Sequence, residues 1–573
     1  MKLVKKLRWQ ILLIVLALAV IGALLWTQRG EDVNQSLDNT PAPSSGGVYK
    51  EGVVGSLSRL NPLLAIYNPV DRDVTRLLFS SLIRFDSKGQ PQPELAESWG
   101  ISRDGQTYNF SLRKDATWHD GSPVTSQDIA FTVELLRSDE FPTLPDLKIF
   151  WEDIEVQVFD EYNLQFRLPE PFTPFLDYLN FGILPFHILG DLAPGEIVDA
   201  EFNIRPVGSG PYQFNGLLTE NGKITGVSLK IFPGYFGKKA YLEEFVFKYY
   251  ENSLQVWNAY QAGEIQGIGE ITSEILPQAF HDPTLNLYTG RLPKLSLVYL
   301  NLENPEVPFF KEIEFRRALL SSLNRQWMID NVLNGQAVIA DGPIFPKTWA
   351  YYDNLQHYKY EPQLAIDAIK ELGYTFPAEG GNVRVKKDEE SEEATRLEFT
   401  LIYPDDEQHA ALAQAIQEDW AELGMNVILE AVPYAELISE RLDTRLYQAA
   451  LVDINLTRTP DPDPYPFWHQ TQTAGGQNYA MWNDRQASEY LEQARITADP
   501  TERTRLYRNF QVRFVDQMPA LPLFYPMYTY GVSSDVKGVR IGPLFEPADR
   551  LTTISDWYLY SELSEATATP SEE

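Results

Sequence analysis

The sequence predicts an α/β fold built on mixed sheets. Residues 397–432 read as a strand, an amphipathic helix and a second strand, and a unit of this spacing pairs its strands in parallel. Residues 108–113 alternate apolar and polar side chains, which is the period of a strand. Asp104-Gly105 precedes that strand and is a hairpin turn signal, so antiparallel pairing is expected there.

Composition limits the function classes. The chain has 573 residues, enough for several domains, and a formal net charge of −32 from 48 basic and 80 acidic residues. This acidic balance disfavours nucleic acid as a partner, because such binding depends on Lys and Arg neutralising phosphates. The sequence has no cysteine, which excludes disulfides, thiolate metal sites and lipidation at an N-terminal cysteine.

The N-terminus carries a hydrophobic segment. Basic residues within 2–8 precede an apolar run over residues 11–26, whose length lies between that of a signal core and that of a spanning helix. Trp9 and Trp26 flank the run, as interface anchors do, and no small-x-small cleavage site follows it. We therefore expect residues 1–30 to be an uncleaved anchor, with a cleavable signal as the alternative.

The basic flank places the body of the protein outside the cytoplasmic membrane, either anchored to its outer face or, if the segment is cleaved, secreted or periplasmic. Residues 31–47 are polar and contain Pro, Ser and Gly, so they are expected to form a flexible linker.

The stretch over residues 90–136 reads as strand, turn, strand, turn and helix. Pro91 and Pro93 disfavour a helix at its start. Asp120-Gly121 is a second turn signal, and Ser126 is a candidate cap for the helix that follows.

The same stretch resembles a known family. Residues 93–99 (PELAESW), 104–113 (DGQTYNFSLR) and 118–129 (WHDGSPVTSQDI) resemble the signature of the peptide, oligopeptide and nickel-type solute-binding proteins of ABC importers. Residues 206–212 (PVGSGPY) and 315–319 (FRRAL) resemble two further motifs of that family. The resemblance implies a two-lobed, periplasmic-binding-protein-like fold with an extra inserted subdomain, the cluster C type.

The resemblance also implies domain boundaries. Lobe I is expected to be discontinuous and to carry the inserted subdomain, lobe II to be continuous, and the C-terminal tail to be disordered. The expected ranges are 48–60, 205–296 and 520–560 for lobe I, 61–204 for the inserted subdomain, 297–519 for lobe II and 561–573 for the tail.

The function implied is capture of peptides by lobe closure and their delivery to an ABC importer. The partners would be a peptide or other small solute and the membrane permease subunits, with the protein itself a monomer. An oligosaccharide or anionic solute is the alternative ligand. An extracellular hydrolase and a ligand sensor are alternatives of another class.

No catalytic, cofactor or metal site is predicted. The sequence has no Walker motif, nucleophile elbow or His-Glu-x-x-His, and its six histidines lack metal-site spacing. His119 and Asp120 are interpreted as turn-forming residues.

The ligand-binding candidates are carried over from the family. Tyr67 and Asn68 follow an Asn-Pro motif and are expected to face the cleft from lobe I. Residues 459–463 (TPDPD) resemble the family's Asp-Pro-Asp loop, in which an Asp about three residues earlier pairs with the peptide's amino group. Arg458 stands at that position, which suits a carboxylate or phosphate and would repel an ammonium.

Three readings of this departure remain open. Asp453 or Asp461 pairs with the amine through a shifted loop, the ligand is not a standard free peptide, or Arg458 only faces solvent or pairs with Asp461. Asn478, Tyr479 and Trp482 resemble a family segment that borders the cleft, where the two aromatic rings would stack on a sugar or an apolar side chain; core packing is the alternative.

Overall fold

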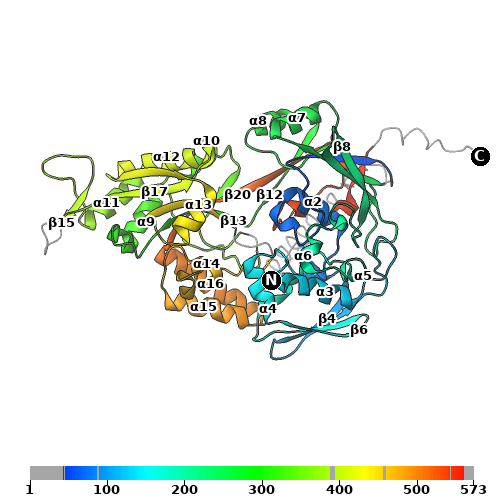
Figure 1. Cartoon of the computed structure of the whole chain (residues 1–573). Coiled ribbons are helices and arrows are strands. Elements are labelled where there is room, and N and C mark those ends of the chain that lie inside the picture. Colours follow the sequence, from blue (N-terminus) through cyan, green and yellow to red (C-terminus); the bar gives the residue numbers. More distant parts are fainter. Residues whose placement is uncertain are drawn as a thin grey trace, which may run out of the picture. The chain divides into compact units, whose positions relative to one another are not determined.

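The computed structural model describes most of the chain outside its two ends (Figure 1). The described residues are 43, 45–86, 89–346, 348–387, 394–455, 460–542 and 544–560. The predicted segment 1–30, the tail 561–573, Arg458 and nearly all of the predicted linker lie outside them. Ser45–Leu559 form one compact unit, to which every contact below belongs. Within the described ranges, no helix is long and apolar enough to cross a membrane.

A mixed sheet of 12 strands runs through this unit. Its strand order is β18 (Asn426–Val432), β17 (Glu398–Pro404), β19 (Ala449–Asn455), β13 (Lys294–Leu300), β20 (Ala520–Ser533), β11 (Gly267–Ile268), β1 (Val48–Val54), β10 (Glu244–Tyr250), β9 (Lys223–Ile231) and β8 (Tyr212–Glu220). The strands β12 (Leu285–Arg291) and β14 (Ala337–Ile339) also pair with β20.

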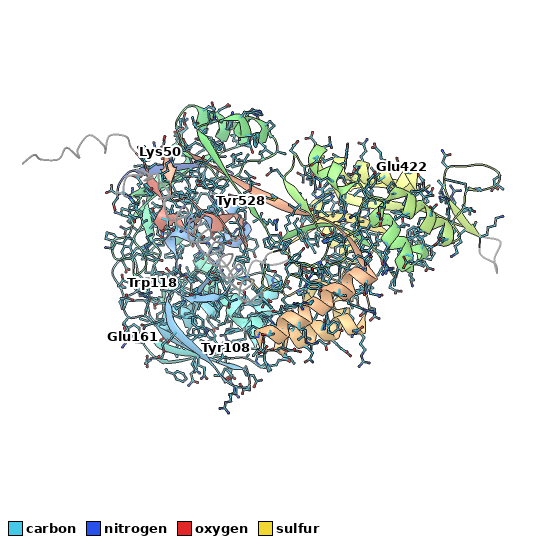
Figure 2. All side chains as sticks on the ribbon, turned by 180° about the vertical axis from the view of Figure 1, so that it is seen from behind. Lys50, Tyr108, Trp118, Glu161, Glu422 and Tyr528 are labelled. Atoms are coloured by element: carbon cyan, nitrogen blue, oxygen red, sulfur yellow. The ribbon has the colours of Figure 1, made fainter. Side chains whose placement is uncertain are left out.

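The sheet has two halves, which meet at strand β20. The first half contains β8 to β12 and β1, and the second half contains β13, β14 and β17 to β19. The first part of β20, up to Pro526, pairs with β13 and β14, and its second part, from Met527, pairs with β12 and β11 (Figure 1). Tyr528, labelled in Figure 2, lies in the second part. The short link between β12 and β13 crosses at the same place, so the chain passes between the two halves along two neighbouring strands.

The hydrophobic core is divided at the point where β20 changes its pairing partners, between Pro526 and Met527. One cluster of buried side chains runs from Leu295 to Tyr525, whereas a second contains Tyr528, Tyr530 and the residues around β1 and the inserted sheet. A small third cluster lies under α7 (Ser253–Gln261) and α8 (Leu276–His281). Each half of the sheet is therefore packed around apolar residues of its own.

The motif-rich stretch folds into a separate antiparallel sheet. The strands run in the order β4 (Ala96–Ile101), β5 (Thr107–Leu112), β7 (Asn163–Arg167) and β6 (Glu155–Asp160). Gly105 takes a φ of 72° in the turn between β4 and β5, a conformation that glycine adopts without strain. The helices α3 (Ser126–Arg137) and α4 (Pro145–Glu152) share a hydrophobic core with this sheet. Trp118, labelled in Figure 2, is fully buried in the same core.

One detail of this stretch differs from expectation. The cap of α3 is Thr125, whose backbone N–H donates to Asp128 Oδ2 at 2.7 Å in a capping box, whereas Ser126 is the first helical residue. The hydroxyl of Ser126 donates instead to the carbonyl of Asp160, which ties the helix to the β6–β7 turn. Both residues favour helix starts, so the sequence did not distinguish them.

The predicted strand–helix–strand unit is confirmed. β17 and β18 pair in parallel, with Leu401 opposite Leu429, and α12 (Glu407–Glu422) connects them. Asp406 caps α12 by accepting the His409 N–H at 2.9 Å, and Gly424 after the helix has a φ of 79°. Figure 2 labels Glu422 at the end of this helix.

The remaining helices lie mostly in the second half. They are α2 (Pro69–Leu78), α9 (Ile313–Ser321), α10 (Arg325–Asn331), α11 (Pro362–Glu371), α15 (Arg485–Ile496) and α16 (Pro500–Gln517), with short helices at Phe186–Leu189, Pro194–Ile197, Tyr434–Glu436 and Tyr465–Trp468. Three two-stranded ribbons pair β2 (Ile83–Phe85) with β3 (Pro91–Pro93), β15 (Val385–Lys387) with β16 (Ala394–Arg396), and β21 (Val536–Lys537) with β22 (Tyr558–Leu559).

Candidate functional site

The carboxyl ends of parallel strands define two edges. In the first half, β10 and β11 run parallel to β1, so these strands end together at Val54, Tyr250 and Ile268. In the second half, β18 and β19 run parallel to β17, and antiparallel β13 begins at this same edge with Lys294. We call these the first and second edges. Ligands of open α/β sheets bind outside the carboxyl ends of the strands. The two edges are therefore candidate positions for a binding site.

The second edge carries a paired polar group. Lys294 Nζ lies 2.6 Å from Asp453 Oδ2, and the Ser296 hydroxyl donates to Asp453 Oδ1. His409 Nε2 lies 3.7 Å from the same carboxylate, while its Nδ1 bonds Asp406 at 2.7 Å. Burial opposes ionisation of Asp453, but the ammonium of Lys294, and then His409, hold the pKa of this carboxyl below its usual value.

The first edge presents Glu270, directly after β11. Its backbone is fixed on both sides, because the Tyr528 hydroxyl donates to the Gly269 carbonyl and the Ile271 N–H donates to the Thr529 carbonyl at 2.8 Å. The side chain is exposed to solvent. Surrounding protein nevertheless desolvates it, which raises the pKa of its carboxyl against the opposing charges of Arg550 and Lys294.

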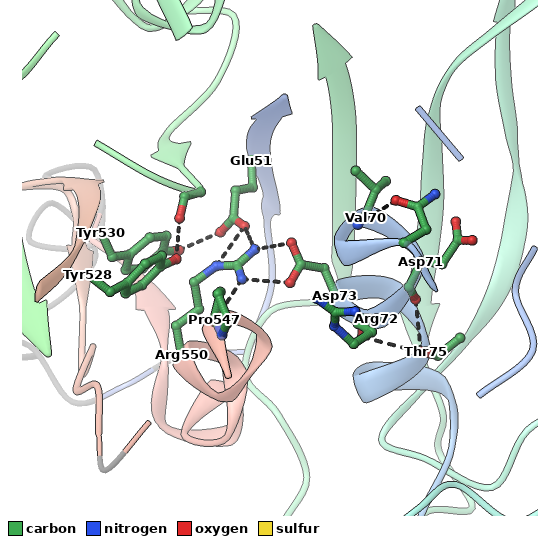
Figure 3. Close-up of polar contacts among 12 residues, drawn as sticks. Glu51, Val70, Asp71, Arg72, Asp73, Thr75, Tyr528, Tyr530, Pro547 and Arg550 are labelled. Atoms are coloured by element: carbon green, nitrogen blue, oxygen red, sulfur yellow. Dashed lines mark hydrogen bonds and ion pairs between the residues drawn. The ribbon is translucent and has the colours of Figure 1, made fainter. Parts of the chain in front are cut away.

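A buried ion network lies behind Glu270 (Figure 3). Arg550 Nη1 and Nη2 each lie 2.7 Å from Asp73, and its Nε donates to Glu51 Oε1 at 3.1 Å. The Tyr530 hydroxyl donates to the other Glu51 oxygen at 2.5 Å. Arg550 thereby joins β1, α2 and the helical turn Pro547–Leu551. One guanidinium faces two carboxylates, and burial raises the pKa of the Glu51 carboxyl against the opposing charge of Arg550.

The Asp-Pro-Asp loop is neutralised from within the second half. Asp461 is buried and pairs with Arg503, and Asp463 receives the guanidinium of Arg495, with Nη2 at 2.7 Å. The Arg495 guanidinium also stacks over the Tyr465 ring, 3.6 Å from its centroid. The predicted site residue Asp461 is therefore in an ion pair with its own chain.

The same loop also contacts the part of the chain that contains the separate antiparallel sheet. The Asp461 N–H donates to Asp177 Oδ1 at 2.9 Å, and the Arg495 guanidinium lies 5.6 Å from the centroid of Phe172. A Cβ placed on Gly89 would come within 2.7 Å of Pro460 Cβ. The loop thus joins segments that are far apart in the sequence.

Tyr67 and Asn68 line a cavity of about 520 Å³ that begins beside the first edge. Its other walls are Ser56, Ser58, Arg59, Leu64, Asp71 and Pro142. Tyr67 is 58% exposed and donates its hydroxyl to the Pro142 carbonyl at 3.0 Å. Asn68 caps α2 by accepting the Val70 N–H at 3.1 Å and donates to the Ser56 carbonyl at 2.8 Å.

Asn478, Tyr479 and Trp482 lie together in the core of the second half, with 0%, 7% and 5% of their surface exposed. The Tyr479 hydroxyl donates to Asp443 at 2.9 Å, and the Trp482 ring packs edge-on against Phe514. The structure therefore groups these three apart from Tyr67 and Asn68. Their role in ligand binding stays a prediction, as does that of Arg458, which lies outside the described residues.

Sequence reasoning missed Glu270 and Lys294. Strand β11 has only two residues, too few for a period-2 pattern, so Glu270 carried no signal of lying at a strand end. Lys294 is the first residue of β13, and its partner Asp453 comes from β19, a strand far away in the sequence. Within the described residues, no group of His, Cys, Asp and Glu is arranged to hold a metal ion.

Two sheet halves with separate cores, crossed by two strands and carrying an inserted antiparallel sheet, define the class of two-lobed, periplasmic-binding-protein-like folds. The conserved pattern of the bacterial extracellular solute-binding proteins, family 5, matches residues 90–477. The chain belongs to this family.

Curated relatives agree with this assignment, and solved structures share the fold. The dipeptide-binding protein of Escherichia coli (strain K12) is 26% identical over 493 residues, covering 82% of this chain and 87% of that protein. The oligopeptide-binding protein AppA of Bacillus subtilis (strain 168) is 24% identical over 91% of this chain and 94% of its own. The structure of B. subtilis AppA in complex with a nonapeptide covers 91% of this chain and 100% of its own, at a TM-score of 0.68 and 23% identity. HbpA2 from Haemophilus parasuis has a TM-score of 0.77 at 21% identity, covering 90% and 100%.

Proposed function

We propose that this protein captures peptides outside the cytoplasm by closing two lobes over them and delivers them to the permease of an ABC importer. Family membership supports solute binding, and the names of the relatives support peptides as the solute. The observation that carries the proposal is the pair of neighbouring strand crossings, β12–β13 and β20, between halves with separate cores. Such an arrangement allows hinge closure, and a ligand that contacts both lobes stabilises the closed form.

The division of the core between the two halves of the sheet supports two lobes. We assign residues 48–60, 205–296 and 520–560 to lobe I, 61–204 to its inserted subdomain and 297–519 to lobe II. β20 refines the last boundary, since its first part pairs with lobe II strands and its second part with lobe I strands.

The N-terminal segment would hold the body at the outer face of the membrane or export it. We expect the protein to act as a monomer that binds no nucleic acid, in keeping with its net charge of −32, and to release its ligand chemically unchanged. Mass spectrometry of the native protein identifies its first residue and so distinguishes an anchor from a cleaved signal. A mature chain starting near Thr27 would show that the segment is cleaved.

Calorimetry on the purified chain with peptides of two to nine residues tests the proposal. We expect saturable binding of at least one length and an increase in Tm with peptide concentration. Mass spectrometry of the recovered peptide is the companion measurement, since a cleaved peptide would instead indicate a hydrolase. Binding of oligosaccharides or organic anions in place of every peptide would identify the alternative ligand class.

A further inference from the structure

The Asp-Pro-Asp loop, residues 460–463, contacts a segment that is anchored in the other hydrophobic core. The loop is followed by α15 and α16, whose buried side chains belong to the core cluster of lobe II. It contacts Asp177 in the turn Thr173–Leu179, and that turn is anchored by Phe175 in the core cluster that lobe I shares with its inserted subdomain. Because each side is anchored in a separate core, the contact holds one lobe against the other.

The lobe II side of this contact is rigidly held. Asp461 is buried and pairs with Arg503, whose Nε also donates to the Ala494 carbonyl at 2.7 Å. Asp463 donates its backbone N–H to Asp461 Oδ1 at 3.1 Å and receives the guanidinium of Arg495. These bonds tie the loop to α15 and α16, so little conformational entropy is lost when another surface docks on it.

The lobe I side presents a hydrogen-bond acceptor and an aromatic ring. Asp177 Oδ1 accepts the Asp461 N–H at 2.9 Å. The Arg495 guanidinium lies 5.6 Å from the centroid of Phe172 in the inserted subdomain and 3.6 Å from that of Tyr465 in lobe II. One cation therefore contacts an aromatic ring from each lobe, which favours the closed arrangement. The turn Thr173–Leu179 also packs against α15.

A third contact leaves no room for a side chain. Gly89 lies in the turn between β2 and β3 of the inserted subdomain, with a φ of 71°. A Cβ placed on it would come within 2.7 Å of Pro460 Cβ, which is closer than two carbon atoms can pack. A side chain at this position would therefore push the loop away from the inserted subdomain.

We propose that the Asp-Pro-Asp loop is an interlobe clasp, which docks on Asp177, Phe172 and Gly89 and stabilises the closed form through contacts that the chain itself supplies. The clasp sets the fraction of closed molecules and thereby scales the affinity for every ligand by one common factor. Arg503 and Arg495 hold the loop in position for this docking. The inference deepens the proposed function and rests on it for the role of lobe closure.

Distances between spin labels on the purified full chain test the clasp without any ligand. Labels at Phe280→Cys in lobe I and Leu364→Cys in lobe II occupy exposed positions. Without peptide, the protein should show a short-distance population, and Asp177→Ala should lower its ratio to the long-distance population about tenfold, as expected for a lost charged hydrogen bond. Phe172→Ala should lower the ratio about two- to fivefold, since a cation–ring contact is weaker. Asp191→Ala, which removes an exposed carboxylate of the same subdomain, should leave it unchanged.

Two glycine variants test the close approach with matched backbone strain. Gly89→Ala places a methyl group against Pro460 and should also reduce the short-distance population. Gly222, in the turn between β8 and β9, has a similar φ of 78°, and a Cβ on it would meet no other atom within 4 Å. Gly222→Ala should therefore leave the distances unchanged. A wild type without a short-distance population, or one that Asp177→Ala leaves intact, would overturn the clasp.

Calorimetry with peptides of two to nine residues separates a clasp from a ligand contact. Because the clasp acts on the equilibrium between open and closed forms, Asp177→Ala should weaken the binding of each peptide by the same factor. Weakening that differs among peptides, with unchanged label distances, would mean that Asp177 contacts the ligand and would overturn the proposal. If no peptide binds, the proposed function is wrong, whereas the label distances still decide whether the clasp exists.

Discussion

His119 shows how one side chain connects two motifs. Its Nδ1 accepts the Gly208 N–H at 3.1 Å, and its Nε2 lies 3.2 Å from the Gly210 carbonyl, so the neutral ring with hydrogen on Nε2 satisfies both. A Cβ on Gly208 would collide with the Leu78 carbonyl, which explains the glycine. The residue predicted to form a turn therefore links the turn at Asp120-Gly121 to the corner at residues 206–212.

This contact predicts a pH dependence of stability. Burial lowers the pKa of His119 from 6.5 to about 4. The unfolded chain therefore takes up a proton before the folded chain does, and stability is lost as pH falls from about 6.5 to about 4. The contribution is on the order of 3 kcal/mol at most. Urea unfolding of the wild type and of His119→Gln across this range should show the steeper loss in the wild type. Parallel curves would contradict the prediction.

At the scale of elements, the Arg550 network holds three segments together. β1, α2 and the turn Pro547–Leu551 come from opposite ends of the body and meet around one guanidinium (Figure 3). All three charged side chains are buried, with Arg550 1% and Glu51 0% exposed. A buried ion pair gives little net stability, but removing one partner leaves the other charge buried without compensation.

Arg550→Met should therefore destabilise the protein by about 3–5 kcal/mol, because Glu51 and Asp73 would remain buried without a cation. Chemical denaturation monitored by tryptophan fluorescence measures this loss. The triple variant Arg550→Met, Glu51→Gln, Asp73→Asn should recover much of it, since it removes the stranded charges. Equal stability of the single and triple variants would show that electrostatics is not the cause.

At the scale of the whole molecule, the paired crossings at β12–β13 and β20 allow a rotation of the lobes that leaves each core unchanged. The contacts of the Asp-Pro-Asp loop with Asp177, Phe172 and Gly89 would be remade or lost in that rotation. Because the chain has no cysteine, introduced cysteines can be labelled without background.

Spin labels at Phe280→Cys on α8 and Leu364→Cys on α11 would report on closure, since both sites are exposed, by 74% and 60%. We expect a saturating peptide to shift the distance distribution between the labels to a shorter and narrower one. A control pair within lobe II, at Leu364 and Leu446, should not change. An unchanged distribution for the first pair, despite calorimetric binding, would exclude hinge closure.

The sequence by itself determined the family, the strand–helix–strand unit at residues 397–432 and the hairpin after Asp104-Gly105. These features depend on side-chain periodicity and turn chemistry, which act between residues close in the chain. Only the tertiary structure decided which carboxylates are paired. Arg503 lies 42 positions from Asp461, and Arg550 lies 499 positions from Glu51, so no local pattern joins them. It also placed Asn478, Tyr479 and Trp482 in a core and left Glu270 unpaired at a strand end, because burial and charge pairing depend on which distant segments pack together.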